Sequence, residues 1–315
     1  MTIQILKRRF VDLRTCGKVR VSGHFEIFKN REGEPRQKVA EFDNLFLNSG
    51  LNLLGTIANF AMCQVGTGTS TPTVGQTALD NFLKSQSRST YVSLSGVDGN
   101  GDPYCEVAVT YSFPLGAVVG TISEIGISNL APPAVLYSRA LIVDMNGNPT
   151  TITLLPTEYL TVIYTFRVFP PLSDYSGVVQ ISGVNYNYTS RAVNVSTASA
   201  WVPNHGITAP FGIGGVGAFR DMASLAPITA TAPNGVTLGL VGSSLDAYVN
   251  NSYTNVSRTL FSQTVANHAN MISGFLLVGQ IAASGCSFQV IVDPVIPKNA
   301  DRTLQVVFSV SWARK

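Results

Sequence analysis

The chain contains few charged residues for its length. Asp, Glu, Lys and Arg together make up 12% of its 315 residues, against roughly 25% in average globular domains. Gly, Ser, Thr, Asn and Val are plentiful instead. This composition predicts a β-rich protein with many turns. We also expect a surface so poor in charge to be largely covered by other subunits.

Cysteines are few and widely separated. Cys16, Cys63, Cys105 and Cys286 form no C-x-x-C pair. Their spacing therefore favours neither a zinc ribbon nor a disulfide framework. Buried thiols and no metal site are the expectation.

Histidines and catalytic motifs are equally scarce. His24, His205 and His268 have no short mutual spacing and no evident carboxylate partner in sequence, and neither a G-x-S-x-G nor an H-E-x-x-H motif occurs. Hydrolase machinery therefore has no support. We predict no catalytic residues and a protein that is not an enzyme. A catalytic site that the fold assembles from residues far apart in the sequence would leave no such motif.

Long apolar runs are also missing. The longest apolar-leaning segment, GFLLVGQIAASG, spans residues 274–285, which is short of the ~18 residues that a membrane span requires. The opening residues MTIQILKRRF lack the apolar stretch of a secretory signal. We expect no membrane insertion, and we expect the protein to be made and folded in a cytoplasm.

Basic residues concentrate near the start of the chain. Of the 21 Lys and Arg residues, 10 lie within residues 1–42: Lys7, Arg8, Arg9, Arg14, Lys18, Arg20, Lys29, Arg31, Arg36 and Lys38. Acidic residues such as Asp12, Glu26 and Glu34 alternate with them. Mixed signs are typical of a solvated strand face and not of a nucleic-acid patch, so we predict no nucleic-acid partner.

Alternation of apolar and polar residues recurs along the chain and is typical of strands. It predicts strands at residues 18–28, 104–113, 136–144, 158–169, 177–188, 287–293 and 303–312. The segment VFPPLSDYSG (168–177) interrupts this pattern with two prolines. We predict an all-β protein with two β-sandwich-like domains, residues 1–175 and 176–315.

Two short helices are predicted on either side of the glycine-rich loop VGTGTSTP (65–72). In the first, Asn48 or Ser49 is the candidate cap. Its apolar residues recur three or four apart at Leu51, Leu54, Ala58 and Ala61. The second helix is expected over Thr77–Leu83, with Leu79, Phe82 and Leu83 on one face.

The glycine-rich loop itself raises the possibility of phosphate binding. It contains Gly66 and Gly68, but Thr71 stands where a dinucleotide fingerprint has its third glycine, and Pro72 follows. The lysine of a P-loop is also missing. We therefore expect the loop to serve the architecture of the protein.

A second glycine motif, FGIGGVGAFRD, matches G-x-G-x-x-G in full through Gly212, Gly214 and Gly217. That fingerprint works only between a buried strand and a helix N-terminus. Pro203 and Pro210 lie in the preceding segment, and no βαβ alternation follows. No cofactor is therefore predicted.

The segment VDGNGDP places Asp98, Asn100 and Asp102 at the spacing of a calcium loop. Pro103 stands where that loop requires glycine, and DMNGNP (144–149) fails in a similar way. Both segments are predicted to be hairpin turns built on Asn-Gly or Asp-Gly pairs, with an irregular surface cation as the alternative.

Four segments occur in an order that resembles a recurrent type of tailed-bacteriophage virion protein, found among tail fibre, neck and other tail-associated components. They are FDNLFLNSGLNLLG, VGTGTSTPTVGQTALDNFL, TISEIGISN (121–129) and LYSRALIVDMNGNPTTITLLPTEYLTVIYTFRVFPP (136–171), within residues 40–171. The most specific of these elements are the VGTGTSTPTVGQTAL loop and the ISEIGIS and LYSRALI pair. The resemblance implies that the loop is architectural and carries no catalytic residues. It implies a virion protein of the tail or neck that is made in the bacterial host cytoplasm, forms symmetric homo-oligomers and contacts other tail or neck proteins.

The alternative function is recognition of a host cell-surface glycan by the C-terminal domain, residues 176–315. Trp201, Tyr248 and Tyr253 are the aromatic residues that could stack on sugar rings, although such residues more often belong to a core. A fibre-borne depolymerase ranks third, because the 18 acidic residues show no paired-carboxylate pattern.

Overall fold

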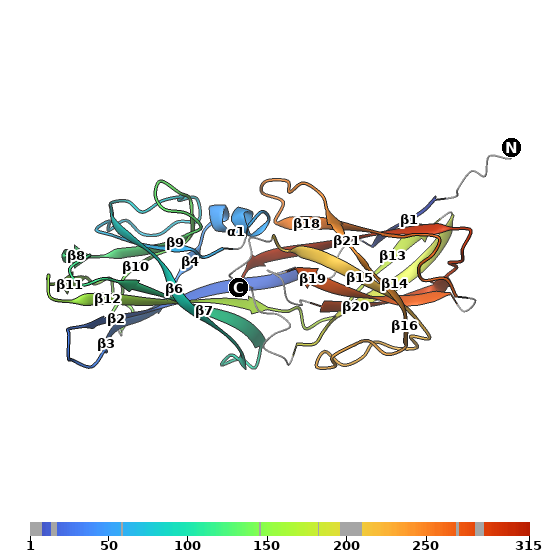
Figure 1. Ribbon diagram of the computed structural model, residues 1–315, viewed down its shortest axis with the longest axis horizontal. Coiled ribbons are helices and arrows are strands. Elements are labelled where there is room, and N and C mark those ends of the chain that lie inside the picture. The colour runs from blue at the N-terminus through green and yellow to red at the C-terminus, as the bar shows by residue number, and fades with distance from the viewer. Residues whose placement is uncertain are drawn as a thin grey trace.

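The computed structural model is an elongated molecule of two lobes (Figure 1). It describes residues 8–13, 18–57, 59–144, 146–181, 183–195, 210–268, 271–280 and 287–315. Strands account for 58% and helix for 3% of the structure, which confirms the predicted all-β fold.

The first lobe is a sandwich of two sheet layers. One layer contains, in order, β3 (Gln37–Asp43), β2 (Lys18–Asn30), β12 (Tyr159–Phe169) and β7 (Pro103–Phe113). The other contains β5 (Met62–Gly66), β9 (Glu124–Ser128), β10 (Leu136–Leu141) and β4 (Leu45–Phe46). The long strand β6 (Phe82–Val97) joins both layers, because its first part pairs with β5 and its second part with β7. The small ladder of β8 (Gly120–Ile122) and β11 (Ile152–Leu154) completes the lobe.

Aromatic residues fill the space between these two layers. The Phe60 ring lies 4.9 Å from that of Tyr137 on β10 and 4.7 Å from that of Phe166 on β12. All three side chains are buried. Offset and edge contacts of this kind stabilise a core beyond the burial of area alone, so Phe60 links the two layers.

The second lobe is also a sandwich. Its six-stranded layer runs β13 (Tyr175–Ile181), β14 (Val184–Val193), β20 (Ser287–Ile296), β19 (Ile272–Gln280), β15 (Gly212–Arg220) and β16 (Val236–Gly242). The facing layer contains β17 (Ser244–Leu245), β18 (Thr254–Phe261), β21 (Thr303–Arg314) and β1 (Arg8–Leu13). The Phe275 and Phe308 rings, 5.9 Å apart, meet between the layers.

Strand β21 joins the two lobes. It pairs with β18 and β1 in the second lobe, while its last residues pair in parallel with Lys18–Val21 of β2. In the described part of the chain, one 13-stranded sheet therefore runs through both lobes. The boundary predicted at residue 175 falls on the first residue of β13. Strand β21 crosses back over this boundary, and the division into two domains stays a prediction.

The helix α1 (Asn48–Leu54) lies at this junction and corrects the first helix prediction. It ends at Leu54 and does not reach Ala61, because Met62 already begins β5. Neither predicted cap acts as one: the N-cap is Leu47, without a side-chain cap. Ser49 Oγ instead donates to the Leu136 carbonyl, and Asn48 Oδ1 accepts from Arg314. Both side chains therefore make tertiary contacts instead of capping the helix.

The second predicted helix, Thr77–Leu83, is wrong. This segment is irregular, with bends at residues 78, 80 and 81, and it enters β6 at Phe82. Of the apolar residues that suggest a helix, Leu79 is buried and packs against Leu47 and Leu136 in a small separate cluster. The backbone hydrogen bonds that a helix would use are made to other segments, beginning with the Thr77 carbonyl, which accepts from Leu136 N at 2.9 Å.

Candidate functional site

The glycine-rich loop holds an anion, and the anion is a carboxylate of the same chain. Glu124, the first residue of β9, is fully buried beneath the loop. Its Oε1 accepts hydrogen bonds from the backbone N–H groups of Gly68 and Asn81, both at 2.8 Å, and its Oε2 accepts from Asp80 N at 3.0 Å. Backbone N–H groups converging on one carboxylate make strong, charge-assisted bonds.

The close approach of Glu124 explains the glycines of this loop. A Cβ atom at Gly68 would lie 2.4 Å from Glu124 Oε1, and one at Gly66 would lie 2.4 Å from the Asn81 carbonyl oxygen. A side chain at either position would push the loop away from the carboxylate. The glycines therefore serve to bring backbone onto Glu124.

Arg139 of β10 completes the site from the other side. Its guanidinium is fully buried and donates from Nε to Glu124 Oε2 at 3.0 Å and from Nη2 to Asp80 Oδ2 at 2.7 Å. The Nη1 atom donates to the Ser70 carbonyl at 3.1 Å and to Gln76 Oε1 at 2.9 Å. We call these five residues, Ser70, Gln76, Asp80, Glu124 and Arg139, the Glu124–Arg139 cluster.

Asp80 is the outermost member of the cluster. Its Oδ2 accepts from the backbone N–H of Ser70 at 3.0 Å and from the Ser70 hydroxyl. The bond from the Ser70 side chain is the main reason why the pKa of Asp80 lies below its ordinary value, and Arg139 lowers it further. Asp80 therefore stays ionised and holds the loop closed over Arg139.

The cluster unites three segments that are far apart in sequence. The loop, the segment TISEIGISN with Glu124 and the segment LYSRALIVD with Arg139 are the same three on which the resemblance to virion proteins mainly depends. Each nitrogen of the guanidinium and both oxygens of Glu124 have partners within the chain. Chemically, the cluster fixes a surface loop.

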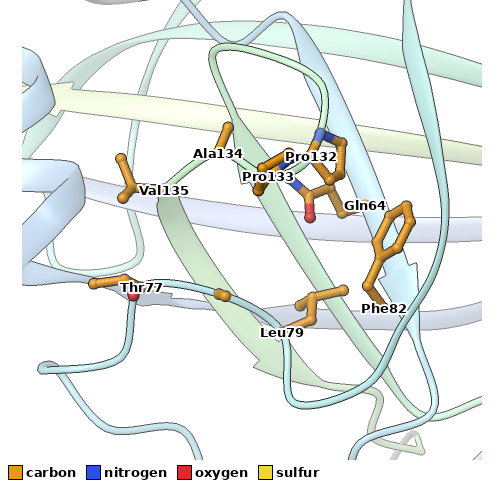
Figure 2. A pocket seen from close by; sticks show the side chains of 9 residues that line it. Gln64, Thr77, Leu79, Phe82, Pro132, Pro133, Ala134 and Val135 are labelled. Carbon is orange, nitrogen blue, oxygen red and sulfur yellow. The ribbon is translucent and has the colours of Figure 1, made fainter.

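A groove of about 640 Å³ lies beside the loop (Figure 2). Residues within 77–82, the segment that contains Asp80 of the cluster, form one wall of the groove. Residues 132–135 form the other wall. In Figure 2, Gln64 lies between the prolines of the second wall and Leu79 and Phe82 of the first. The lining residues are Gln64, Thr77, Ala78, Leu79, Phe82, Pro132, Pro133, Ala134 and Val135.

The chemistry of the groove is apolar. None of the nine described residues that line it is ionisable. Phe82 and Val135 are 45% and 43% exposed, and the Gln64 amide is held by a hydrogen bond from its Nε2 to Ser128 Oγ at 2.8 Å. Such a surface suits contact with apolar groups of a partner.

The second glycine motif has a different structure from a dinucleotide loop. Gly212, Gly214 and Gly217 lie within β15, which pairs antiparallel with β16 on one side and β19 on the other. A strand paired on both sides presents no helix N-terminus to a pyrophosphate.

The segment VDGNGDP is the turn between β6 and β7, as predicted. Asp98 Oδ1 accepts from the backbone N–H groups of Asn100 at 2.9 Å and Asp102 at 3.0 Å. Arg20 and Lys315 pair with the carboxylates of Asp102 and Asp98. Across the described part of the chain, no group of three or more His, Cys, Asp or Glu residues could hold a metal ion.

His24 has carboxylate partners that the sequence did not reveal. Its Nδ1 lies 2.7 Å from Asp43 Oδ1 and its Nε2 lies 3.3 Å from Glu41 Oε1. The hydrogen bond with Asp43 is the largest cause of a raised His24 pKa. The partners lie on the neighbouring strand β3, where His24 is opposite Asp43. His268 is partly buried, and His205 lies outside the described residues.

The aromatic residues considered for sugar stacking have structural contacts. The Tyr248 ring stacks on Trp312 with centroids 5.9 Å apart, and its hydroxyl donates to Asn52 Oδ1 of α1 at 2.8 Å. Tyr253 is partly buried against the core. Tyr248 therefore connects the second lobe to α1, and Trp201 lies outside the described residues.

Two of the four cysteines are described, and both are buried as expected. Cys63 and Cys105 are completely inaccessible, and burial raises the pKa of the Cys63 thiol well above its ordinary value. Cys16 and Cys286 lie outside the described residues.

No helix in the described ranges is long and apolar enough to cross a membrane. Comparisons with known proteins found no matching family, no similar curated protein and no similar solved structure.

Proposed function

We propose that the chain is a non-enzymatic structural protein of a tailed-bacteriophage virion, a fibre, collar or tail-associated component of the tail or neck. Its copies assemble through symmetric interfaces with one another and with other tail or neck proteins. The observation that carries the proposal is the Glu124–Arg139 cluster, since the three segments that resemble virion proteins meet in it.

The chemistry of the cluster supports an architectural role. A catalytic or ligand-binding site presents polar groups to its substrate, whereas Glu124 and Arg139 are fully buried and bonded to the chain's own loop. At the protein surface next to the cluster lie the fixed loop and the apolar groove. Contact surfaces of assembled proteins have this character.

The continuity of the two lobes supports the same role. Strand β21 pairs in both lobes, and Trp312 near its end donates from Nε1 to the Leu51 carbonyl of α1 at 2.8 Å. A continuous sheet and a shared helix resist movement of one lobe against the other. A stiff, elongated subunit suits a component that must keep its neighbours at fixed positions.

The experiment is quantitative mass spectrometry of purified particles of the phage that encodes the chain. The proposal expects the chain in mature particles in a fixed copy number. A Phe82→Ser, Val135→Ser double variant should fold normally, because both side chains are exposed, yet be incorporated less. Leu240→Ser, at a residue 65% exposed on the other lobe, is the matched control for the groove. Absence of the wild-type chain from particles would refute the proposal.

A further inference from the structure

Strand β6 has an open edge in its second part. It pairs with β5 from Phe82 to Ser87, and the Arg88 N–H still donates to the Ala61 carbonyl at 3.0 Å. Its ladder with β7 runs on to Val97. Among the described residues, no strand pairs with the other edge of Val92–Val97. An edge of this length is a template on which another strand can add.

The open edge lacks the features that normally prevent such pairing. Proteins usually protect an edge strand with charged residues or proline, and residues 89–97, STYVSLSGV, contain neither. The edge strand β3 of the same layer is different: its sequence QKVAEFD contains Lys38, Glu41 and Asp43. One edge of this layer is therefore protected by charge and the other is not.

Apolar side chains of the open edge are exposed on both faces of the sheet. Val92 and Leu94 lie on one face and are 55% and 48% exposed, while Val97, on the opposite face, is 64% exposed. A strand that adds to this edge must therefore be uncharged, extended and apolar on both faces. The second part of β6 itself meets all three conditions.

We propose that this edge pairs with the same edge of a second copy of the chain, antiparallel across a twofold axis at Ser93. In this register Ser93 lies opposite Ser93 of the partner subunit. Val92 lies opposite Leu94 of the partner subunit, and the symmetry repeats that apolar pair. Cross-strand apolar pairs stabilise a ladder, and no like charges meet because residues 89–97 are uncharged.

The inference rests on the proposed function only in that copies of the chain assemble. The inference specifies the surface through which two copies meet. In an isologous contact, the same surface of both copies is buried. The groove beside the loop is formed largely by other residues and stays available for a different component.

Disulfide formation tests the register. In a Ser93→Cys variant the two thiols face each other, because residues paired across an antiparallel ladder have Cα atoms about 4.5–5.5 Å apart, within reach of a disulfide. In Ser95→Cys the corresponding atoms are separated by about 14 Å along and across the strands. Both serines are exposed, so both variants should fold.

With diamide as the oxidant, non-reducing electrophoresis should show at least about tenfold more covalent dimer for Ser93→Cys than for Ser95→Cys or wild type. Equal amounts in all three would overturn the proposal. A Leu94→Lys variant should move the mass measured by light scattering from dimer toward monomer while its far-UV circular dichroism spectrum stays that of the folded wild type. An unchanged dimer would also overturn it, and strand addition by another protein would then account for the edge.

The two proposals can fail separately. If Ser93→Cys crosslinks but the chain is absent from particles, the edge pairing stands and the virion role falls. If the chain is present in particles and Ser93→Cys does not crosslink, the virion role stands and the edge pairing falls.

Discussion

Arg139 Nη2 lies 2.8 Å from Glu124 Oε2, and neither side chain has any exposed surface. The two residues belong to neighbouring strands, β10 and β9, and lie diagonally across the ladder, which pairs Arg139 with Gly126 and Leu141 with Glu124. The ion pair therefore ties the glycine-rich loop to the centre of a sheet layer.

Replacing Glu124 by Gln should strongly destabilise the protein. The variant leaves the Arg139 guanidinium buried with Asp80 as its remaining acid partner, and breaking a buried pair typically costs about 3–5 kcal/mol. Denaturation with urea would measure the loss in the free energy of unfolding. Limited proteolysis should show faster cleavage within residues 66–81.

The matched control is Asp246→Asn, which breaks the exposed pair between Asp246 and Arg258. A surface pair contributes about 0–1 kcal/mol, so this variant should stay close to wild type. Equal losses from Glu124→Gln and Asp246→Asn would contradict the role assigned to the buried cluster.

Gly50→Ala should destabilise the protein, although the residue lies within α1. Alanine in a helix is ordinarily favoured over glycine by about 1 kcal/mol. Here a Cβ atom would lie 2.1 Å from the Tyr137 carbonyl oxygen, so the helix must move away from β10, and overpacking of this kind costs about 1–3 kcal/mol. Thermal unfolding would show the sign of the change.

Gly75→Ala is the control for this substitution. No atom lies within 4 Å of the Cβ position at Gly75, and the change should stay within about 0.5 kcal/mol. If Gly50→Ala were as harmless as Gly75→Ala, the close packing of α1 on β10 would be wrong.

The contribution of His24 to stability should depend on pH. Asp43 and Glu41 raise its pKa above the value of 6.5 expected in the unfolded chain, so protonated His24 stabilises the fold. This contribution is fully present below pH 6.5 and is lost as the pH rises through the raised folded pKa. The pKa of Asp43 is lowered, mainly by its hydrogen bond with His24, so Asp43 stays ionised across this range.

The measurement is the difference in unfolding free energy between wild type and His24→Gln at about pH 5.5 and about pH 8.5. The wild-type advantage should be larger at the lower pH. An advantage that stays constant or grows with pH would show that Asp43 and Glu41 do not stabilise the charged imidazole.

Trp312→Phe should weaken the attachment of α1 to β21. The variant keeps the aromatic contact but removes the donor to the Leu51 carbonyl, and a buried acceptor left without its partner costs about 1–3 kcal/mol. Hydrogen exchange should become faster in residues 48–54. Unchanged exchange there would mean that other contacts of α1 suffice.

Much of the strand content could be predicted from the sequence. Alternation predicted β2, β7, β12 and β21 close to their observed bounds, because each has one face toward a core. It did not predict β6, because side chains on both faces of its second part are exposed and no alternation results. The predicted strand 177–188 is in fact the hairpin of β13 and β14, which turns at Gly183 with a φ of 83°.

The candidate site could be predicted only in part. The missing lysine and third glycine argue against a phosphate loop. The group that the loop holds could not be identified, because Glu124 lies 56 residues beyond Gly68. For the same reason the spacing of apolar residues in 77–83 predicts a helix that does not form. That spacing is a local feature, whereas Glu124, which binds the backbone of Asp80 and Asn81, is distant in sequence.

The most direct test of the virion role is a cryo-EM map of the intact particle of the phage that encodes the chain. The account predicts density for both lobes in symmetric copies on the tail or neck. A mature particle whose tail and neck are fully traced without this chain would contradict it.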